Sequence, residues 1–203
     1  MVLVDIGNTH FHIWREGKIT HSKKIQSFKD DVYYISVNRQ KEQELLALNP
    51  KAVNIKDYVR FDTDYKGLGI DRIMACKSIT DGVVVDAGSA ITIDIMHQGF
   101  HKGGIIMPGI YAFKKAFGTI SEVLKLNEKI ITDEKLPNST NEALNMGSIG
   151  AVKCIIEKYA KDKNLFFTGS DGKFLSKMFA NAEYIEDLVF KGMLITLKEM
   201  EKK

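Results

Sequence analysis

Short apolar runs that end in polar turns are the most regular pattern along this chain. The run at 2–4 leads into the sequence DIGNT (5–9), and the run at 83–85 leads into DAGSA (86–90). Apolar runs of this length, bounded by turn residues, are typical of buried β-strands. Each run therefore predicts a strand that carries an aspartate to its end, followed by a tight polar turn.

The segments that follow the two turns are also alike. FHIWREGKIT comes after the first turn and ITIDIMHQGFHKGG after the second, and each predicts a β-hairpin, with turns at Gly17 and Gly99. The repeated order of strand, turn and hairpin indicates an internal duplication, with two phosphate-binding loops that face each other across a cleft. We therefore divide the chain into two fused halves, 1–81 and 82–203.

Helical and strand patterns alternate through the rest of the chain, which is typical of an α/β protein. We expect each half to be a mixed sheet flanked by helices. The expected strands are 32–37, 52–55, 165–168 and 183–185, and the expected helices are 40–48, 70–79, 110–126, 141–160, 173–180 and a final one from 187.

Composition and charge exclude several classes of function. The net charge is only +3, and the densest basic patch, KITHSKK (18–24), lacks interleaved aromatic residues, so we expect no nucleic-acid partner. No apolar run is long enough to span a bilayer, and Asp5 interrupts the one run that could begin a signal peptide. Cys76 and Cys154 lack metal-ligand spacing and predict reduced thiols. We expect a cytoplasmic protein without a membrane partner.

The first turn has the chemistry of a phosphate-binding loop. Gly7 lacks a Cβ, so a phosphate can approach its N–H group, and Asn8 and Thr9 supply further donors. Asp5, at the strand end, is suited to hold a hydrated Mg²⁺ over that phosphate. Phosphoryl transfer to an alcohol needs one more carboxylate to accept the hydroxyl proton, and Asp71, in the first turn of a predicted helix, is a candidate.

Six stretches together resemble one family, the type III pantothenate kinases. They are DIGNT (5–9), GIDR (69–72), DAGSA (86–90), GGIIMPG (103–109), STNEAL (139–144) and DLVFKGM (187–193). The resemblance implies two duplicated actin-like (ribonuclease H-like) halves with a nucleotide cleft between them. It also implies the activity: ATP-dependent phosphorylation of pantothenate, the first step of coenzyme A biosynthesis.

The resemblance also implies a role for individual residues, with Asp71 as the catalytic proton acceptor. The departures from the family pattern are the short segment 66–68 before GIDR, a Ser at position 89 where Thr is common, and TGSDG at 168–172. The implied substrate contacts are Tyr65, Gly69, Ile70, Asp71, Arg72 and Thr140, and the implied ATP contacts are Asp5, Ile6, Gly7, Asn8, Thr9, His10, Phe11, His12 and Ser89. Asp86 matches a monovalent-cation ligand for K⁺ or NH₄⁺, and Asp5 the Mg²⁺ ligand.

Arg72 suits an anionic substrate, because a guanidinium can grip a carboxylate through two parallel hydrogen bonds. The histidines at 10, 12, 97 and 101 alternate along strands like surface residues, and we expect them to be structural apart from backbone contact with the nucleotide at 10 or 12. The resemblance implies a homodimer, for which the apolar segment 110–126 is the candidate interface.

Two other classes of function remain open at this point. A kinase of a sugar or acetate, or a polyphosphate hydrolase, would keep both Asp-x-Gly loops but would not need GIDR. A non-catalytic nucleotide-dependent regulator could lose the Asp71 base, which this chain retains.

Overall fold

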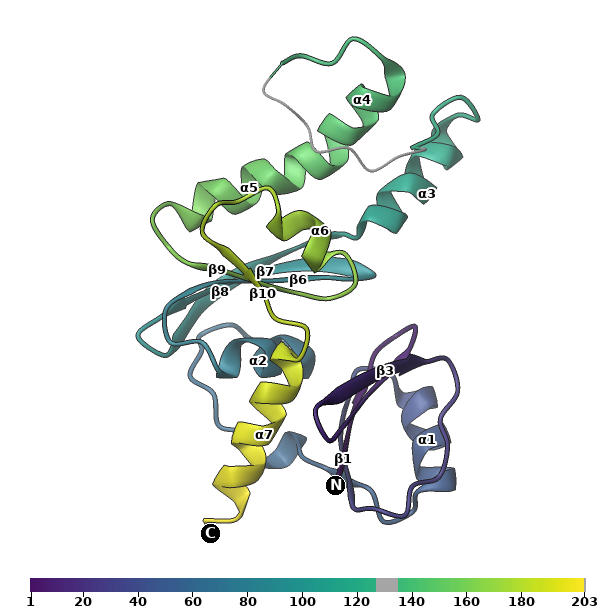
Figure 1. Cartoon of the computed structure of the whole chain (residues 1–203), viewed down its shortest axis with the longest axis vertical. Helices are drawn as coiled ribbons and strands as arrows, with labels where there is room; N and C mark the ends of the chain where they lie inside the picture. Colours follow the sequence, from purple (N-terminus) through teal and green to yellow (C-terminus); the bar gives the residue numbers. More distant parts are fainter. Residues whose placement is uncertain (127–134, 203) are drawn as a thin grey trace. The chain divides into compact units, whose positions relative to one another are not determined.

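The computed structural model describes residues 1–126 and 135–202, which form two compact units (Figure 1). The first unit consists of Met1–Thr80, Gln98–Lys102 and Asp187–Lys203, and the second of Asp81–His97 and Gly103–Glu186. The units thus differ from the expected halves 1–81 and 82–203 at Asp81, which belongs to the second unit, and in the segments 98–102 and 187–203, which belong to the first. The cause is tertiary packing: the last helix of the chain packs on a helix of the first unit.

The first unit is built on a five-stranded mixed sheet with the order β3-β2-β1-β4-β5. β1 pairs antiparallel with β2 and parallel with β4. The strands are β1 (Val2–Ile6), β2 (Phe11–Arg15), β3 (Lys18–Ser22), β4 (Val32–Ser36) and β5 (Val53–Asn54). The helices are α1 (Arg39–Leu48), a 3₁₀ turn (Lys56–Tyr58), α2 (Ile70–Lys77) and α7 (Leu188–Met200).

β1 is buried on both faces, and helices cover both of them. Val2, Val4 and Ile6 join the apolar cluster that contains Leu45 of α1. Leu3, which is also fully buried, points to the opposite face because side chains alternate along a strand. Figure 1 shows α1 and α7 on opposite sides of β1. This burial fixes the strand that carries Asp5.

α2 and α7 pack closely because α7 has a glycine where the two helices meet. A Cβ on Gly192 would collide with the backbone carbonyl of Met74. One turn further along α7, the Thr196 hydroxyl lies 3.8 Å from the Met74 sulfur. Lys77 and Glu199 form an ion pair at 3.0 Å. These contacts hold α2, the helix that follows Gly69, in a fixed place within the first unit.

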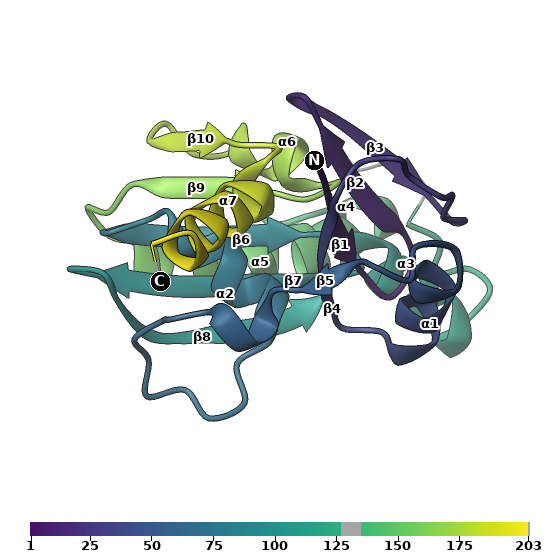
Figure 2. The ribbon, with the colours of Figure 1, turned by 90° about the horizontal axis from the view of Figure 1, so that it is seen from below.

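The second unit repeats the strand order of the first. Its sheet has the order β10-β9-β6-β7-β8, as Figure 2 shows, and counted from the first strand of each unit the two orders are identical. The strands are β6 (Gly82–Ala87), β7 (Ala90–His97), β8 (Phe100–Pro108), β9 (Leu165–Thr168) and β10 (Ala182–Tyr184). The helices are α3 (Ile110–Ile120), α4 (Thr140–Asn145), a π-helical turn (Met146–Gly150), α5 (Ala151–Ala160) and α6 (Gly172–Ser176).

Both predicted hairpins turn at the expected glycines. Glu16 and Gly17 have φ of 51° and 79°, and Gln98 and Gly99 have φ of 51° and 78°. Two successive residues with positive φ make a type I′ turn, whose twist matches that of the paired strands. The duplicated sequence pattern therefore corresponds to a duplicated backbone conformation.

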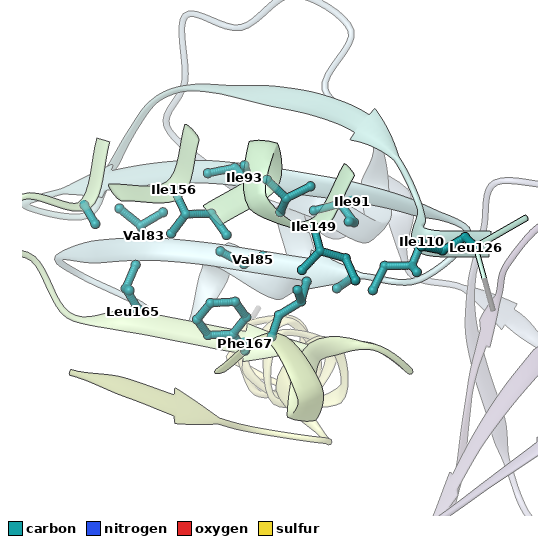
Figure 3. Packing of buried hydrophobic residues seen from close by; sticks show 14 of the residues in the cluster. Val83, Val85, Ile91, Ile93, Ile110, Leu126, Ile149, Ile156, Leu165 and Phe167 are labelled. Atoms are coloured by element: carbon teal, nitrogen blue, oxygen red, sulfur yellow. The ribbon is translucent and has the colours of Figure 1, made fainter. Parts of the chain in front are cut away.

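The core of the second unit encloses β6, the strand that carries Asp86. Val83 and Val85 of this strand are fully buried and pack with Ile91 and Ile93 of β7 and Phe167 of β9 (Figure 3). Ile149 and Ile156, on the helical segment that leads through α5, close the same cluster. Burial on this scale makes the position of Asp86 at the end of β6 a rigid one.

Two predicted helices differ from those in the structure. The helix expected at 110–126 ends at Ile120, with Ser121 in extended conformation at φ −162°. Gly118 and Thr119 precede this end and are weak helix formers, and the Thr119 hydroxyl donates to the carbonyl of Ala116. The helix expected at 141–160 is present but contains the π-helical turn. None of the helices in the described part of the chain combines the length and apolar content needed to traverse a bilayer.

Candidate functional site

The first loop, residues 5–12, joins β1 to β2 through a tight turn. The Gly7 N–H donates to the carbonyl of His10 at 3.1 Å, and Asp5 lies opposite His12 in the antiparallel ladder. Asn8 and Thr9 are exposed, whereas Ile6 and Phe11 are fully buried. A nucleotide at this loop could contact Ile6 and Phe11 only through their backbone, while Asn8 and Thr9 offer side chains and backbone alike.

The rings of His12 and His21 meet beside this loop, with 2.7 Å between their Nδ1 atoms. Burial, together with the neighbouring charges of His21, His10 and Lys41, lowers the pKa of His12 from 6.5 to about 4. His12 is therefore uncharged at neutral pH, and its ring cannot supply a positive charge to the loop.

Lys41, in the first turn of α1, brings a positive charge to this loop. Its Nζ donates to the carbonyl of Thr9 at 2.9 Å and lies 4.6 Å from the centre of the Phe11 ring. The sequence did not point to Lys41, because it lies 32 residues from Thr9 and only the pairing of β1 with β4 brings α1 to the loop.

GIDR forms the start of α2, with Gly69 as the N-cap residue. An oxygen of the Asp71 carboxylate accepts from the backbone N–H of Arg72 at 2.8 Å. A Cβ on Gly69 would come within 2.6 Å of the same carboxylate oxygen. The carboxylate can fold back over the helix start only because residue 69 is glycine, which gives the glycine of this motif a steric reason.

Arg72 lies against Tyr65. The side chain of Arg72 is almost fully buried, and its Cζ is 4.9 Å from the centre of the Tyr65 ring. The structure thus brings together Tyr65, Gly69, Ile70, Asp71 and Arg72, all of which were expected to contact the substrate. The short segment between Tyr65 and GIDR does not prevent this arrangement.

The expectation that His101 is a surface residue is wrong. Its side chain is fully buried, and its ring lies 6.0 Å from the Tyr65 ring and 5.9 Å from the Phe61 ring, measured between centres. The reason is a β-bridge between Thr63 and His101, which folds the loop at 61–65 over the histidine. The sequence predicted this loop only as irregular and contained no signal for a bridge over 38 residues.

A pocket of about 450 Å³ opens beside the start of α2, wholly within the first unit. The backbone N–H of Val37, a lining residue, donates to the carbonyl of Ile6 at 3.1 Å, so the pocket is one strand away from Gly7. Its lining combines apolar side chains and glycines with a single hydroxyl and a single ammonium group: Ser36, Val37, Lys56, Val59, Phe61, Gly67, Leu68, Gly69, Ile70 and Ile73.

The second loop, which contains Gly88 and Ser89, is closed by its own backbone and by Gly109. The Gly88 N–H donates to the carbonyl of Ala90 at 2.9 Å, and the Gly109 N–H donates to that of Ser89 at 3.2 Å. A Cβ on Gly109 would collide with the carbonyls of Gly88 and Ser89. The last glycine of GGIIMPG therefore has a structural function, since it lets β8 end directly against this loop.

Asp86 and Ala87 present oxygens to the glycine of TGSDG. A Cβ on Gly169 would lie 2.5 Å from a carboxylate oxygen of Asp86 and 2.5 Å from the carbonyl oxygen of Ala87. The Asp171 N–H donates to the same carbonyl at 2.8 Å. A carboxylate and a carbonyl are ligands that hard cations accept, so this set of oxygens fits the expected monovalent ion.

Among the described residues, no three His, Cys, Asp or Glu side chains gather into a metal-binding cluster. A cation at Asp5 or Asp86 would therefore bind to one carboxylate together with backbone, phosphate or water oxygens. That is the usual situation of Mg²⁺ in phosphoryl-transfer sites, where the protein supplies one or two carboxylates.

Thr140 is the exposed first residue of α4 in the second unit. The preceding Ser139 caps the helix by accepting from the Glu142 N–H at 3.4 Å. The Glu142 carboxylate accepts from the N–H of Asn138, the residue before the cap, at 3.2 Å. The predicted site residues thus fall into two sets, one in each unit, with Asp86, Ser89 and Thr140 in the second.

Comparison with known proteins identifies one family. Residues 36–162 match the model of the family described as type III pantothenate kinase. A relative of that name from Wolinella succinogenes is 45% identical over all of this chain and 99% of its own length. One from Helicobacter hepaticus is 43% identical over 98% of this chain and 99% of its own length.

Solved structures give a matching result for the fold. A Campylobacter jejuni structure, described as a Baf family transcriptional activator, is 38% identical and covers both chains in full, with a TM-score of 0.88. A Sinorhizobium meliloti structure, described as a 2-dehydro-3-deoxygalactonokinase, is 9% identical with a TM-score of 0.57 over 98% of each chain, which bears on the fold alone. The expected pair of mixed sheets with flanking helices is confirmed.

Proposed function

Because this chain belongs to the type III pantothenate kinases, we propose that Asp71 is its catalytic base and that Arg72 binds the carboxylate of the substrate. The protein is a pantothenate kinase, which uses ATP to phosphorylate pantothenate in the first step of coenzyme A biosynthesis. The observation that carries the proposed roles is that loop 5–12, the pocket and the start of α2 adjoin one another within the first unit.

The pocket in the first unit suits a small organic acid such as pantothenate. Its volume of about 450 Å³ lies in the range of small-molecule sites, and its lining is largely apolar. Gly69, Ile70 and Ile73 line it, and Asp71 and Arg72 lie between them on the same helix without being lining residues. In this arrangement Asp71 takes the proton of the terminal hydroxyl, while Arg72, held against Tyr65, pairs with the carboxylate at the other end.

The nucleotide contacts belong to the two loops. Residues 5–12 and Ser89 hold the phosphates of ATP, with Lys41 as an added positive charge beside the first loop. Asp5 would hold Mg²⁺, which would supply positive charge beside the phosphates. Asp86, with the carbonyl of Ala87, holds K⁺ or NH₄⁺.

Three further features belong to the same proposal. Thr140 contacts pantothenate, the protein is cytoplasmic, and two copies form a homodimer through α3. The support for the dimer is the exposed apolar surface of that helix, where Tyr111 is 73% exposed and Ile120 is 71% exposed.

The Campylobacter jejuni structure suggests a second candidate, since it is described as a transcriptional activator. A regulator without catalysis would have no use for a carboxylate at position 71 or for a glycine at 69 that gives it room. This chain has both, which favours the enzyme.

An acceptor panel separates these possibilities. The purified protein with ATP, Mg²⁺ and K⁺ should phosphorylate pantothenate and leave sugars and acetate unchanged, as measured by ADP release. We expect Asp71→Asn to lower kcat by about 10²- to 10⁴-fold, the usual contribution of a general base, with ATP binding nearly unchanged.

The control is Asp64→Asn, which alters an exposed carboxylate in the same region of the chain and should retain full activity. Wild-type turnover in Asp71→Asn would remove Asp71 from the mechanism. Turnover of a sugar or acetate in place of pantothenate would identify a different kinase.

A further inference from the structure

We propose that His101 and its hydrogen bond to Thr63 form a support for Tyr65, and that this support sets how firmly Arg72 holds the substrate carboxylate. His101 would be a positioning residue, because it acts through Tyr65 and Arg72 and does not itself touch the substrate. The inference rests on the proposed role of Arg72. It assigns a function to a histidine that the sequence pattern had suggested was a surface residue.

Three hydrogen bonds connect the histidine to the loop before GIDR. The hydroxyl of Thr63 lies 2.8 Å from Nδ1 of His101 and 3.4 Å from its carbonyl oxygen, and the backbone N–H of His101 donates to the carbonyl of Asp62 at 2.9 Å. Within the loop, the same hydroxyl accepts from the backbone N–H of Tyr65 at 3.0 Å. One hydroxyl therefore joins the imidazole ring to the backbone of the residue whose ring faces Arg72.

The rings continue this connection to the guanidinium. The centre of the Tyr65 ring is 6.0 Å from that of His101, and the same ring faces Arg72, whose Cζ is 4.9 Å away. Phe61 packs against His101 at 5.9 Å. Arg72 is only 5% exposed, so its direction depends on its protein neighbours, of which the Tyr65 ring is one, more than on water. A shift of the Tyr65 ring would change where the guanidinium points.

A purely apolar side chain at position 101 would not need a hydrogen-bond partner. His101 is 0% exposed, and burying a polar ring is unfavourable unless it is hydrogen-bonded. Thr63 provides that bond from a loop that the β-bridge holds in place. Since aromatic stacking restricts a guanidinium and an ordered guanidinium binds a planar carboxylate with less loss of freedom, the support should act on substrate affinity.

Two conservative variants test the hydrogen bond from its two ends. His101→Phe keeps an aromatic ring but cannot bond to Thr63, and Thr63→Val keeps the shape of the side chain but lacks the hydroxyl. We expect each to raise the KM for pantothenate about three- to tenfold, the effect of losing one net hydrogen bond, while kcat and the KM for ATP stay within about twofold of wild type. Thr63→Ser restores the hydroxyl and should restore the wild-type KM.

His97→Phe is the matched control, because it replaces a half-exposed histidine that bonds to Asp81 at 3.1 Å. A double-mutant cycle gives the decisive measurement. Arg72→Ala alone should raise the KM for pantothenate, and adding His101→Phe to it should cause no further rise, because the histidine acts through the arginine.

The outcomes separate the inference from the function on which it rests. An unchanged KM for pantothenate in Arg72→Ala would overturn the proposed role of Arg72, and the inference with it. A raised KM in Arg72→Ala with wild-type KM in both His101→Phe and Thr63→Val would overturn the inference alone. The inference would also be overturned if kcat fell, both KM values rose and thermal stability was lost together. That pattern would indicate a general structural role for His101. Thr63→Val keeps the test open if His101→Phe fails to fold.

Discussion

At the scale of single residues, Gly69 decides where the Asp71 carboxylate can lie. Its backbone has φ −62°, which any residue adopts, so the glycine is not required by backbone conformation. It is required by space, because a Cβ would come within 2.6 Å of the carboxylate oxygen that bonds to the Arg72 N–H. The geometry of the proposed base thus depends on an absent methyl group.

Gly69→Ala should therefore impair catalysis without unfolding the protein. The added methyl displaces the carboxylate by about an ångström, and a misplacement of that size in a catalytic group can lower kcat by about 10²-fold. Steady-state kinetics on the variant would measure this loss. Gly118→Ala is the control, since a Cβ there meets no atom within 4 Å. Equal activities of the two variants would contradict the steric role of Gly69.

The residues of the candidate site fall into two groups: those that a short sequence motif indicates, and those that only the three-dimensional structure reveals. Asp5, Asp71 and Asp86 could be proposed from the sequence because each stands in a short motif with a glycine two positions away. Lys41 and His101 could not, since each reaches the site through contacts more than 30 residues distant, with Thr9 and Thr63. Motifs report on local geometry, whereas supporting residues depend on which segments pair in space.

At the scale of elements, the contact between α2 and α7 explains the glycine of DLVFKGM. The Gly192 Cα approaches the Met74 carbonyl so closely that no side chain fits. The strands and hairpins were predictable because alternation and turn glycines are local signals. The placement of α7 in the first unit was not predictable, because no pattern in the sequence of α7 identifies the helix on which it packs.

Gly192→Ala should destabilise the protein by about 1–3 kcal/mol, the usual effect of overpacking. Helix propensity alone predicts the opposite sign, a gain of about 1 kcal/mol from replacing glycine with alanine inside a helix. Chemical denaturation measures the free energy of unfolding directly. Gly118→Ala, inside α3 and without a neighbour, should show the propensity effect by itself. Stabilisation by Gly192→Ala would show that the two helices can move apart.

At the scale of the whole molecule, the two sheets are copies in strand order and in the place of their aspartates. Asp5 and Asp86 each lie near the end of the first strand of their sheet, and each is followed by an antiparallel strand. The sequence predicted this duplication because both copies retain the same turn residues.

We expect the protein in solution to have twice the mass of one 22.9 kDa chain. Charges placed on the exposed face of α3, by Tyr111→Glu with Ile120→Glu, should convert it to a monomer, because an apolar interface does not tolerate unpaired charge. Sedimentation equilibrium measures both masses. Tyr58→Glu, on a partly exposed tyrosine of the first unit, is the control. A monomeric mass for the wild-type protein would contradict the proposed homodimer.

The contact between His12 and His21 makes the fold sensitive to acid. In the unfolded chain His12 takes up a proton near its ordinary pKa of 6.5, whereas burial delays this in the folded protein until the pKa of about 4. Between these values the unfolded state binds more protons, so the free energy of unfolding falls as the pH is lowered through this interval. The free energy of unfolding, measured by denaturation at pH 7 and at pH 5, should differ less between the two pH values in His12→Gln than in wild type. His97→Gln, which also removes one imidazole, is the matched control. An enzyme that keeps this ring uncharged beside loop 5–12 should therefore tolerate alkaline surroundings better than acidic ones.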